Sequence, residues 1–157
     1  MTKQARDIMS HDLFVVSPEM SLVEMDKALA TENISGAPVV EDGALVGIVT
    51  STDIGQTFSN NLKSEEGEAS YYWHSNGTLT SLIFGADNDD SALADRIRAC
   101  KVADIMTRKV IAVDPHDDVK KVAQLMTEYK IHRVLVVENK KPVGIITSLD
   151  MVGVLAQ

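Results

Sequence analysis

The sequence predicts an α/β (α+β) fold of two β-α-β-β-α repeats separated by a long central insert. Three observations lead to this prediction. A shift of 97 residues aligns 5–54 with 102–151 without a gap, both copies keep the same order of apolar runs and turn residues, and both end on nearly the same motif. Of the 50 aligned positions, 15 are identical. Such self-similarity indicates a duplicated structural unit.

The first half of each repeat predicts a strand followed by a helix. Residues 13–16 and 110–113 are apolar runs, and a proline, which lacks an N–H donor, follows each run within two residues. Ser21 and Glu24 predict a capping box at the start of the first helix. Apolar residues with the spacing of one helix face are Leu22, Met25 and Leu29 in the first repeat and Val119, Val122, Ala123 and Met126 in the second.

The second half of each repeat predicts a hairpin and a final helix. Residues 37–40 and 134–137 are the first strands of these hairpins, and the second strands end at the shared motif. Asp42-Gly43 is strongly typical of a two-residue hairpin turn, whereas the corresponding Asn139-Lys140 is a weaker turn sequence.

The shared motif reads Gly-Ile-Val-Thr-Ser-Thr-Asp at 47–53 and Gly-Ile-Ile-Thr-Ser-Leu-Asp at 144–150. Its β-branched run suits a buried strand. The polar residues that follow predict a helix start, with Ser51 or Ser148 as N-cap and the aspartate in the first turn. Free N–H groups at a helix start can hold an anion. The threonine hydroxyl and the aspartate could then contact a phosphate and a sugar diol.

We expect domain boundaries at 1–58 for the first repeat, 59–100 for the insert and 101–157 for the second repeat. Within the insert, Asn76-Gly77 predicts an aromatic hairpin, although a helix through 79–84 remains an alternative. Ser91 could cap a helix that leads into the second repeat. The insert also holds three of the chain's seven aromatic residues at 71–73, which we interpret as a small core or an interface rather than a base-stacking site.

Composition excludes several classes of protein. The net charge of −8 argues against a nucleic-acid partner. No apolar run is long enough to span a membrane, and the start has no hydrophobic signal region. Cys100 is the only cysteine, which fits a cytoplasmic protein. The sequence contains no Walker loop, zinc-protease motif or nucleophile elbow, so we expect no enzyme activity, no catalytic residues, no metal and no required cofactor.

The repeated motifs resemble a tandem pair of CBS domains, also called a Bateman module. The resemblance rests on Asp-Ile-Met before the first strand, the proline after it, the middle strand Ala-Pro-Val-Val or Arg-Val-Leu-Val-Val, and the Gly-Ile-(Val/Ile)-Thr-Ser-x-Asp motif. It implies two units packed with pseudo-two-fold symmetry, adenosine-nucleotide sites (AMP, ADP or ATP) in the cleft between them, and pairing into a homodimer. It also implies a regulatory role, here toward a separate and unknown protein partner.

The resemblance assigns ligand-binding roles to residues of both repeats. Thr50 and Thr147 become phosphate contacts, and Asp53 and Asp150 become ribose contacts; the alternative is that each aspartate only favours its helix N-terminus. The adenine would lie along two apolar strand segments, at 15–17 and 111–113. The residues expected to bind from these segments are Val16, Ser17, Ile111 and Val113.

The two repeats differ in charge beside this motif. The second repeat has His132-Arg133, which resembles the phosphate-binding pair in the gamma subunit of AMP-activated protein kinase, where the first repeat has Ser35-Gly36. Residues 102–157 carry a net charge of +1 and residues 1–54 carry −6. We therefore expect an asymmetric module with one phosphate-binding site and one weaker or uncharged-ligand site. The alternative function is a dimerisation or partner-docking module whose nucleotide cleft is vestigial.

Overall fold

The computed structural model describes residues 3–62 and 92–156, which form two compact units. Unit 1 comprises Met1–Phe14, Asp42–Leu45 and Lys109–Gln157, and unit 2 comprises Val15–Glu41 and Val46–Arg108. Each unit therefore combines most of one repeat with the opening residues of the other; we call these residues, 1–14 in unit 1 and 101–108 in unit 2, the exchanged segments. The hairpin predicted near Asn76-Gly77 and the predicted cap Ser91 lie outside the described residues.

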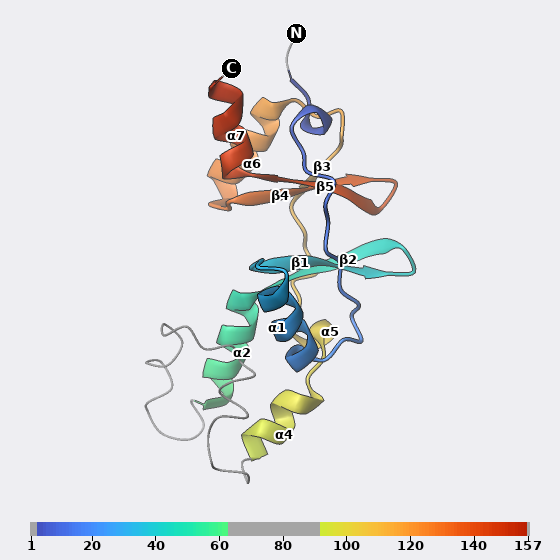
Figure 1. Ribbon diagram of the computed structural model, residues 1–157, viewed down its shortest axis with the longest axis vertical. Coiled ribbons are helices and arrows are strands. Elements are labelled where there is room, and N and C mark those ends of the chain that lie inside the picture. Colours follow the sequence, from blue (N-terminus) through green and yellow to red (C-terminus); the bar gives the residue numbers. More distant parts are fainter. Residues whose placement is uncertain (1–2, 63–91, 157) are drawn as a thin grey trace. The chain divides into compact units, whose positions relative to one another are not determined.

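Unit 2 contains most of the first repeat and the helices that lead into the second. Its elements are α1 (Leu22–Thr31), β1 (Gly36–Glu41), β2 (Ala44–Thr50), α2 (Ser51–Leu62), α4 (Ala92–Ala99) and α5 (Val102–Ile105). The first two residues of β2 fall in unit 1. β1 and β2 form a two-stranded sheet, and α1 and α2 lie on the same side of it (Figure 1). α1 contacts both α2 and α4.

Unit 1 is a three-stranded sheet with two helices. Its elements are η1 (Ala5–Asp7), β3 (Ala112–Val113), α6 (Val119–Tyr129), β4 (Arg133–Glu138), β5 (Lys141–Thr147) and α7 (Ser148–Leu155). β4 is central, with β3 parallel to it on one edge and β5 antiparallel on the other. α6 and α7 lie on the same side of this sheet (Figure 1). Within the described residues, no helix is long and apolar enough to cross a membrane.

The prediction of a strand at residues 13–16 of the first repeat is wrong. Only Val16 pairs, through an isolated parallel bridge to Val39, and the rest of 13–16 is irregular. In the second repeat, the predicted strand 110–113 shortens to β3. The apolar runs are real core segments, since Val16 and Val113 are both buried. They make few ladder hydrogen bonds because a proline follows each run closely and cannot donate to a ladder.

The two hairpins have the same turn despite their different turn sequences. Asp42 and Gly43 have φ of 50° and 79°, and Asn139 and Lys140 have φ of 50° and 65°. Positive φ at both central residues defines a type I′ turn, which matches the right-handed twist of the flanking strands. The strong prediction at 42–43 is confirmed. At 139–140 the strand pairing imposes the same turn on a lysine, which disfavours that backbone conformation.

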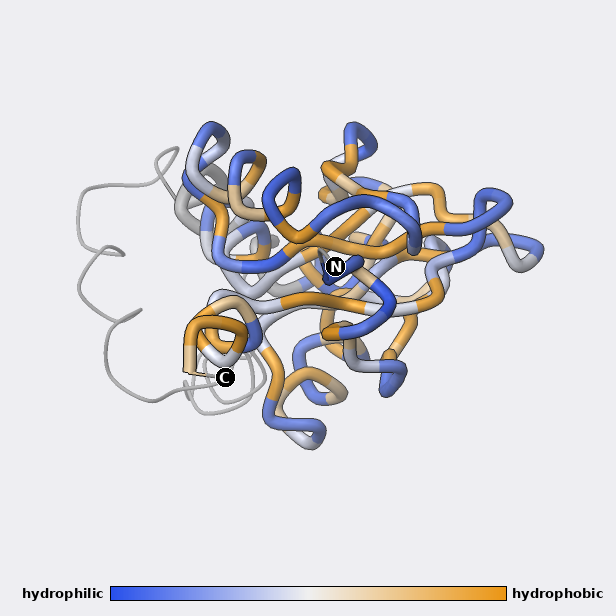
Figure 2. Tube along the Cα trace, turned by 90° about the horizontal axis from the view of Figure 1, so that it is seen from above, coloured by the Kyte–Doolittle hydropathy of each residue, from blue (hydrophilic) through white to orange (hydrophobic). Residues whose placement is uncertain are grey.

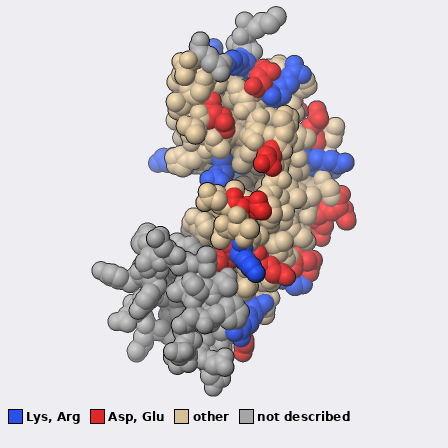
Figure 3. Space-filling view, in the orientation of Figure 1, with Lys and Arg blue, Asp and Glu red and all other residues tan. Residues whose placement is uncertain are grey.

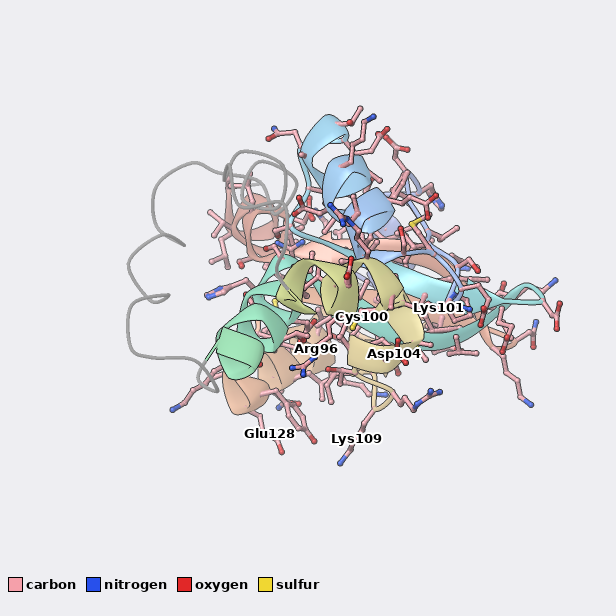
Figure 4. All side chains as sticks on the ribbon, turned by 90° about the horizontal axis from the view of Figure 1, so that it is seen from below. Arg96, Cys100, Lys101, Asp104, Lys109 and Glu128 are labelled. Atoms are coloured by element: carbon pink, nitrogen blue, oxygen red, sulfur yellow. The ribbon has the colours of Figure 1, made fainter. Side chains whose placement is uncertain are left out.

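Equivalent backbone hydrogen bonds fasten the exchanged segments to the repeats. In unit 1 the Ala5 amide donates to the Asp117 carbonyl at 2.8 Å, and in unit 2 the Val102 amide donates to the Met20 carbonyl at 2.9 Å. An ion pair between Lys101 and Glu19 supports the second attachment and raises the pKa of Lys101. Figure 4 shows Lys101 at the junction between α4 and α5. Each repeat is thus completed by residues from the opposite side of the repeat boundary.

The exchanged segments also explain the glycine that opens each shared motif. A Cβ placed on Gly144 would lie 2.5 Å from the Met9 sulfur, and one placed on Gly47 would lie 2.8 Å from the Met106 sulfur. Real Cβ atoms do not approach so closely, so a side chain at either position would require the methionine to shift. The Asp-Ile-Met sequence and the shared motif, recognised separately in the sequence, are therefore two halves of one packing contact.

The predicted helix faces supply much of the core. Leu22, Met25 and Leu29 are buried in unit 2, and Val122 is buried in unit 1 with Met126 packed against its core cluster, which confirms these assignments. α7 differs, because much of its apolar surface is exposed; Figure 2 shows it largely in hydrophobic orange near the C-terminus. Its exposed apolar side chains are Leu149, Val152 and Leu155.

The Met9–Gly144 contact predicts a specific stability effect. Gly144→Ala should lower the free energy of unfolding by about 1–3 kcal/mol, because an added methyl group overpacks the site. Gly153→Ala is the matched control, since a Cβ there meets nothing within 4 Å. It should raise stability by up to about 1 kcal/mol through helix propensity. Urea denaturation measures both changes.

A second substitution tests the proposed cause. Met9→Ala in the Gly144→Ala background removes the colliding sulfur, so its cost should be smaller than in the wild-type background. Additive costs of the two substitutions, or no loss of stability in Gly144→Ala, would show that this contact does not require the glycine.

Candidate functional site

Each repeat carries a hydrogen-bonded threonine–aspartate pair where its last strand becomes its last helix. The Thr147 amide and hydroxyl both donate to Oδ2 of Asp150 at 2.7 Å, and the Asp150 amide donates back to the Thr147 hydroxyl at 3.4 Å. In unit 2 the Thr50–Asp53 pair makes the same three bonds at 2.7, 2.8 and 3.3 Å. These are capping boxes, in which residues N-cap and N3 satisfy one another's amides.

The prediction that Ser51 or Ser148 is the N-cap is wrong by one residue. Thr147 is the N-cap of α7, with extended backbone angles, and Thr50 makes the equivalent bonds at α2. The reason is that a capping box pairs the N-cap with the side chain three residues later, and the aspartate stands in that position only for the threonine. The serine hydroxyls instead donate to carbonyls that precede the middle strands, at 3.4 Å for Ser51 to Ser35 and 3.0 Å for Ser148 to His132.

At both helix starts, protein oxygens accept hydrogen bonds from amides that we predicted to be free for an anion. The Ser148 amide donates to the His132 carbonyl, and the Asp150 amide donates to Thr147. Unit 2 repeats this pattern with the amides of Ser51 and Asp53. Two of the first three amides of each helix are therefore already bound to protein oxygens. A phosphate at these helix starts would need donors from side chains.

Unit 1 brings such a donor to the site. Arg133 pairs with Thr147 across the β4–β5 ladder, so the guanidinium-bearing residue and the capping threonine are direct cross-strand neighbours. His132 precedes Arg133, is exposed, and is tied to the start of α7 through its carbonyl. The structure thus brings together the four predicted residues His132, Arg133, Thr147 and Asp150 at one end of the sheet.

Unit 2 has a different structure at the matching position. Gly36 lies against the end of β2, where an added Cβ would be 2.9 Å from the Val49 carbonyl oxygen and 3.0 Å from Thr50 Cγ2. The backbone of β2 therefore fills the space in which a side chain would begin. No sequence pattern indicates this contact, because a glycine at a strand start has many possible causes.

The segments predicted to contact adenine lie mainly in the cores of the units. Val16 is 2% exposed and Val113 is 3% exposed. Ile111 is half-buried and precedes β3, and Ser17 is exposed, with its hydroxyl accepting a hydrogen bond from the Glu19 amide. The structure places Val16 and Ser17 beside β1, and no described hydrogen bond joins Ser17 to Thr50 or Asp53.

Charge is mixed on the visible surface. Acidic and basic side chains alternate over the face shown in Figure 3, without a continuous basic stripe in that view. A nucleic-acid backbone requires a concentrated basic patch.

The capping interpretation predicts a measurable contribution from Thr147. Thr147→Ala removes both hydroxyl bonds and should lower the free energy of unfolding by about 1 kcal/mol. Thr147→Ser retains the hydroxyl and should keep most of the stability, with both changes measured by urea denaturation. Equal losses in the two variants would mean that the methyl group, not the hydroxyl, matters at this position.

Comparison with known proteins identifies the family. The CBS domain family matches residues 5–56 and 102–157. The chain is 32% identical over 155 residues to the uncharacterized protein MJ1426 of Methanocaldococcus jannaschii, covering 96% of this chain and 89% of that protein. It is 29% identical over 150 residues to inosine-5′-monophosphate dehydrogenase of Korarchaeum cryptofilum, covering 95% of this chain but only 24% of the enzyme.

Solved structures show the same fold. The CBS domain pair of protein MJ0100, in complex with 5′-methylthioadenosine and S-adenosyl-L-methionine, has a TM-score of 0.69 and 26% identity, covering 99% of this chain and 98% of that chain. CBSX2 in complex with AMP has a TM-score of 0.67 and 25% identity, covering 98% and 96%. The chain belongs to the CBS domain family and carries two CBS domains in tandem.

Proposed function

We propose that this chain is a regulatory module that binds an adenosine-containing nucleotide of the AMP, ADP or ATP type and signals to a separate partner protein. The observation that carries the proposal is the threonine–aspartate pair, built identically at the last strand end of both repeats. Two CBS pairs of the same fold, MJ0100 and CBSX2, are in complex with adenosine-containing ligands. CBS pairs are regulatory rather than catalytic modules, which supports a sensing role.

The geometry suggests how the pair would contact a nucleoside. The described hydrogen bonds of Asp150 and Asp53 to the capping threonines all reach Oδ2, so Oδ1 can accept from a ribose hydroxyl without opening the cap. A carboxylate accepts such bonds with extra strength because it is charged. The capping bond therefore holds the aspartate in one orientation before any ligand arrives.

The threonine has a narrower role than the sequence implied. Its hydroxyl hydrogen already points to the aspartate, so it cannot also donate to a phosphate oxygen while the cap is closed. In unit 1 the phosphate would instead be bound by Arg133, whose planar group of donors matches phosphate oxygens, with His132 as a second donor.

Regulation requires that the ligand bind two conformations with different affinity, because a ligand with equal affinity for both shifts neither. A ligand that contacts both Asp150 and Arg133 would bridge the start of α7 and the start of β4. A change in the position of α7 is the simplest way to pass the binding event to another protein.

A ligand panel tests the proposal. AMP, ADP, ATP, NAD and S-adenosylmethionine are added to the full chain, and unfolding is followed by thermal shift. A ligand at 100 times its Kd should stabilise the native state by about 2.7 kcal/mol. Asp150→Asn should weaken this stabilisation, and Glu128→Gln, an exposed carboxylate on α6, is the matched control. No shift with any ligand would favour the docking module with a vestigial cleft.

We also propose that the chain forms a homodimer through α7. Leu149, Val152 and Leu155 are 79%, 58% and 87% exposed, and α7 has no lysine or arginine. Its one acid, Asp150, is held by the cap. An uncharged apolar helix face can pair with its own copy about a two-fold axis without opposing like charges.

The dimer proposal predicts a change in oligomeric state. Leu155→Glu should shift the chain from dimer to monomer in sedimentation equilibrium, because it places two like charges in a desolvated interface. Tyr129→Glu, on an exposed apolar residue of α6, should leave the dimer intact. A monomeric wild-type chain, or dissociation by both variants alike, would contradict an interface on α7.

A further inference from the structure

We propose that Met9 and Met106 are redox-sensitive contacts: oxidation of their thioethers to sulfoxides by a peroxide releases the exchanged segments from the repeats that they complete. The two methionines are equivalent under the shift of 97 residues, and each lies against the glycine that opens a shared motif. This inference concerns how the repeats are held together, and it does not depend on a bound ligand.

The space between each sulfur and its glycine is already filled. A Cβ placed on Gly144 would lie 2.5 Å from the Met9 sulfur and 2.8 Å from Met9 Cγ, and a Cβ placed on Gly47 would lie 2.8 Å from the Met106 sulfur. Even one methyl group would therefore require the methionine to shift. Close-packed contacts of this kind tolerate an added atom poorly, so an oxygen on the glycine side of the sulfur does not fit.

The surroundings of the two sulfurs also offer little to a polar oxygen. Met9 packs against the core cluster of unit 1, whose buried members are all aliphatic and have no side-chain donor: Ala5, Val113, Val122, Val134, Val136 and Ile146. Beside Met106, the Thr107 carbonyl oxygen lies 3.0 Å from the same Cβ position on Gly47, and an acceptor cannot bond a second acceptor. A sulfoxide is polar and needs a donor or water, so hydration draws the side chain out of the contact.

One backbone bridge beside each methionine depends on this packing. Ser10 and Ile145 exchange two amide-to-carbonyl hydrogen bonds of 2.9 and 3.0 Å, and Ile48 and Thr107 exchange two of 2.9 Å. Both pairs are isolated bridges rather than parts of a ladder. Because no neighbouring ladder bonds keep them closed, the adjacent methionine on its glycine supports them. Loss of that packing should therefore open both bridges.

Exposure and chemistry both allow the reaction. Met9 and Met106 are half-buried, whereas Met25 is 0% exposed. A sulfur lone pair attacks one oxygen of hydrogen peroxide, the S–O bond forms, the O–O bond breaks, and the leaving hydroxide takes the proton of the transferred oxygen to become water. The thioether is oxidised by two electrons and the peroxide is reduced. Methionine sulfoxide reductases reverse the change, so the contact can close again.

Hydrogen exchange of the peroxide-treated full chain tests the inference, with sulfoxides located by peptide mass spectrometry. Oxidation should modify Met9 and Met106 before Met25. It should also raise the exchange rates of the Ser10 and Thr107 amides by about 5- to 30-fold, the factor by which loss of one ordinary contact shifts an opening equilibrium.

Two variants assign the effect to these sulfurs. Met9→Leu/Met106→Leu nearly conserves side-chain volume and cannot form the sulfoxides, so peroxide should leave its exchange at its own untreated rate. Met126→Leu is the matched control, because Met126 packs against the same core cluster as Met9, whereas the atoms nearest to a Cβ on Gly144 all belong to Met9. This control should respond to peroxide as the wild-type chain does.

Reversal separates methionine from cysteine oxidation. Methionine sulfoxide reductases A and B with dithiothreitol should restore the protection of the Ser10 and Thr107 amides. Dithiothreitol alone reduces an oxidised Cys100 but not a sulfoxide, so it should restore nothing. Recovery with dithiothreitol alone, an equal rise in the treated Met9→Leu/Met106→Leu chain, oxidation of Met25 as fast as of Met9, or sulfoxides without faster exchange would each overturn the inference. None of these results bears on nucleotide binding, which the ligand panel tests separately.

Discussion

The threonine–aspartate capping box is the interaction on which the functional part of this structure depends. It ends β2 and β5, starts α2 and α7, and fixes the carboxylate that we propose as the ribose contact. A single set of bonds therefore determines both local structure and the orientation of the candidate ligand group. The two explanations that the sequence left open, helix capping and ligand binding, are compatible, because capping uses one carboxylate oxygen and leaves the other.

The exchange of segments places the capping boxes in a rigid setting. Met9 lies over Gly144 and Met106 lies over Gly47, so each motif strand is held by a residue from beyond the repeat boundary. The packing of each repeat therefore includes the opening residues of the other repeat.

Much of the fold follows from the sequence because it depends on local patterns. The apolar spacing of Leu22, Met25 and Leu29 predicts a helix face from a few residues, as the Asp42-Gly43 pair predicts its turn. The shift of 97 residues shows the duplication directly in the sequence. The predictions that are wrong concern residues whose backbone structure is determined by tertiary contacts. Residues 13–16 are apolar enough for a strand but form only one bridge, and Lys140 adopts a turn that its type disfavours because strand pairing requires it.

The residues of the candidate site remain a prediction, and only part of their local geometry follows from the sequence. The spacing of a capping box, from Thr50 to Asp53 and from Thr147 to Asp150, is visible in the sequence, but the prediction placed the cap on the serine, which is the commoner N-cap type. The close approach of Gly36 to β2 depends on three-dimensional distance and leaves no pattern in the chain. That contact leaves unit 2 without room for a side chain at the position that Arg133 occupies in unit 1.

The most direct test of the central claim is an amide chemical-shift titration of the uniformly ¹⁵N-labelled full chain with AMP. We expect the largest shifts at the capping box of unit 1, on Thr147 and Asp150, and on Arg133 across the ladder. Saturation of the chain by AMP without shifts of these amides, or no amide shift at any AMP concentration, would contradict nucleotide binding at this capping box.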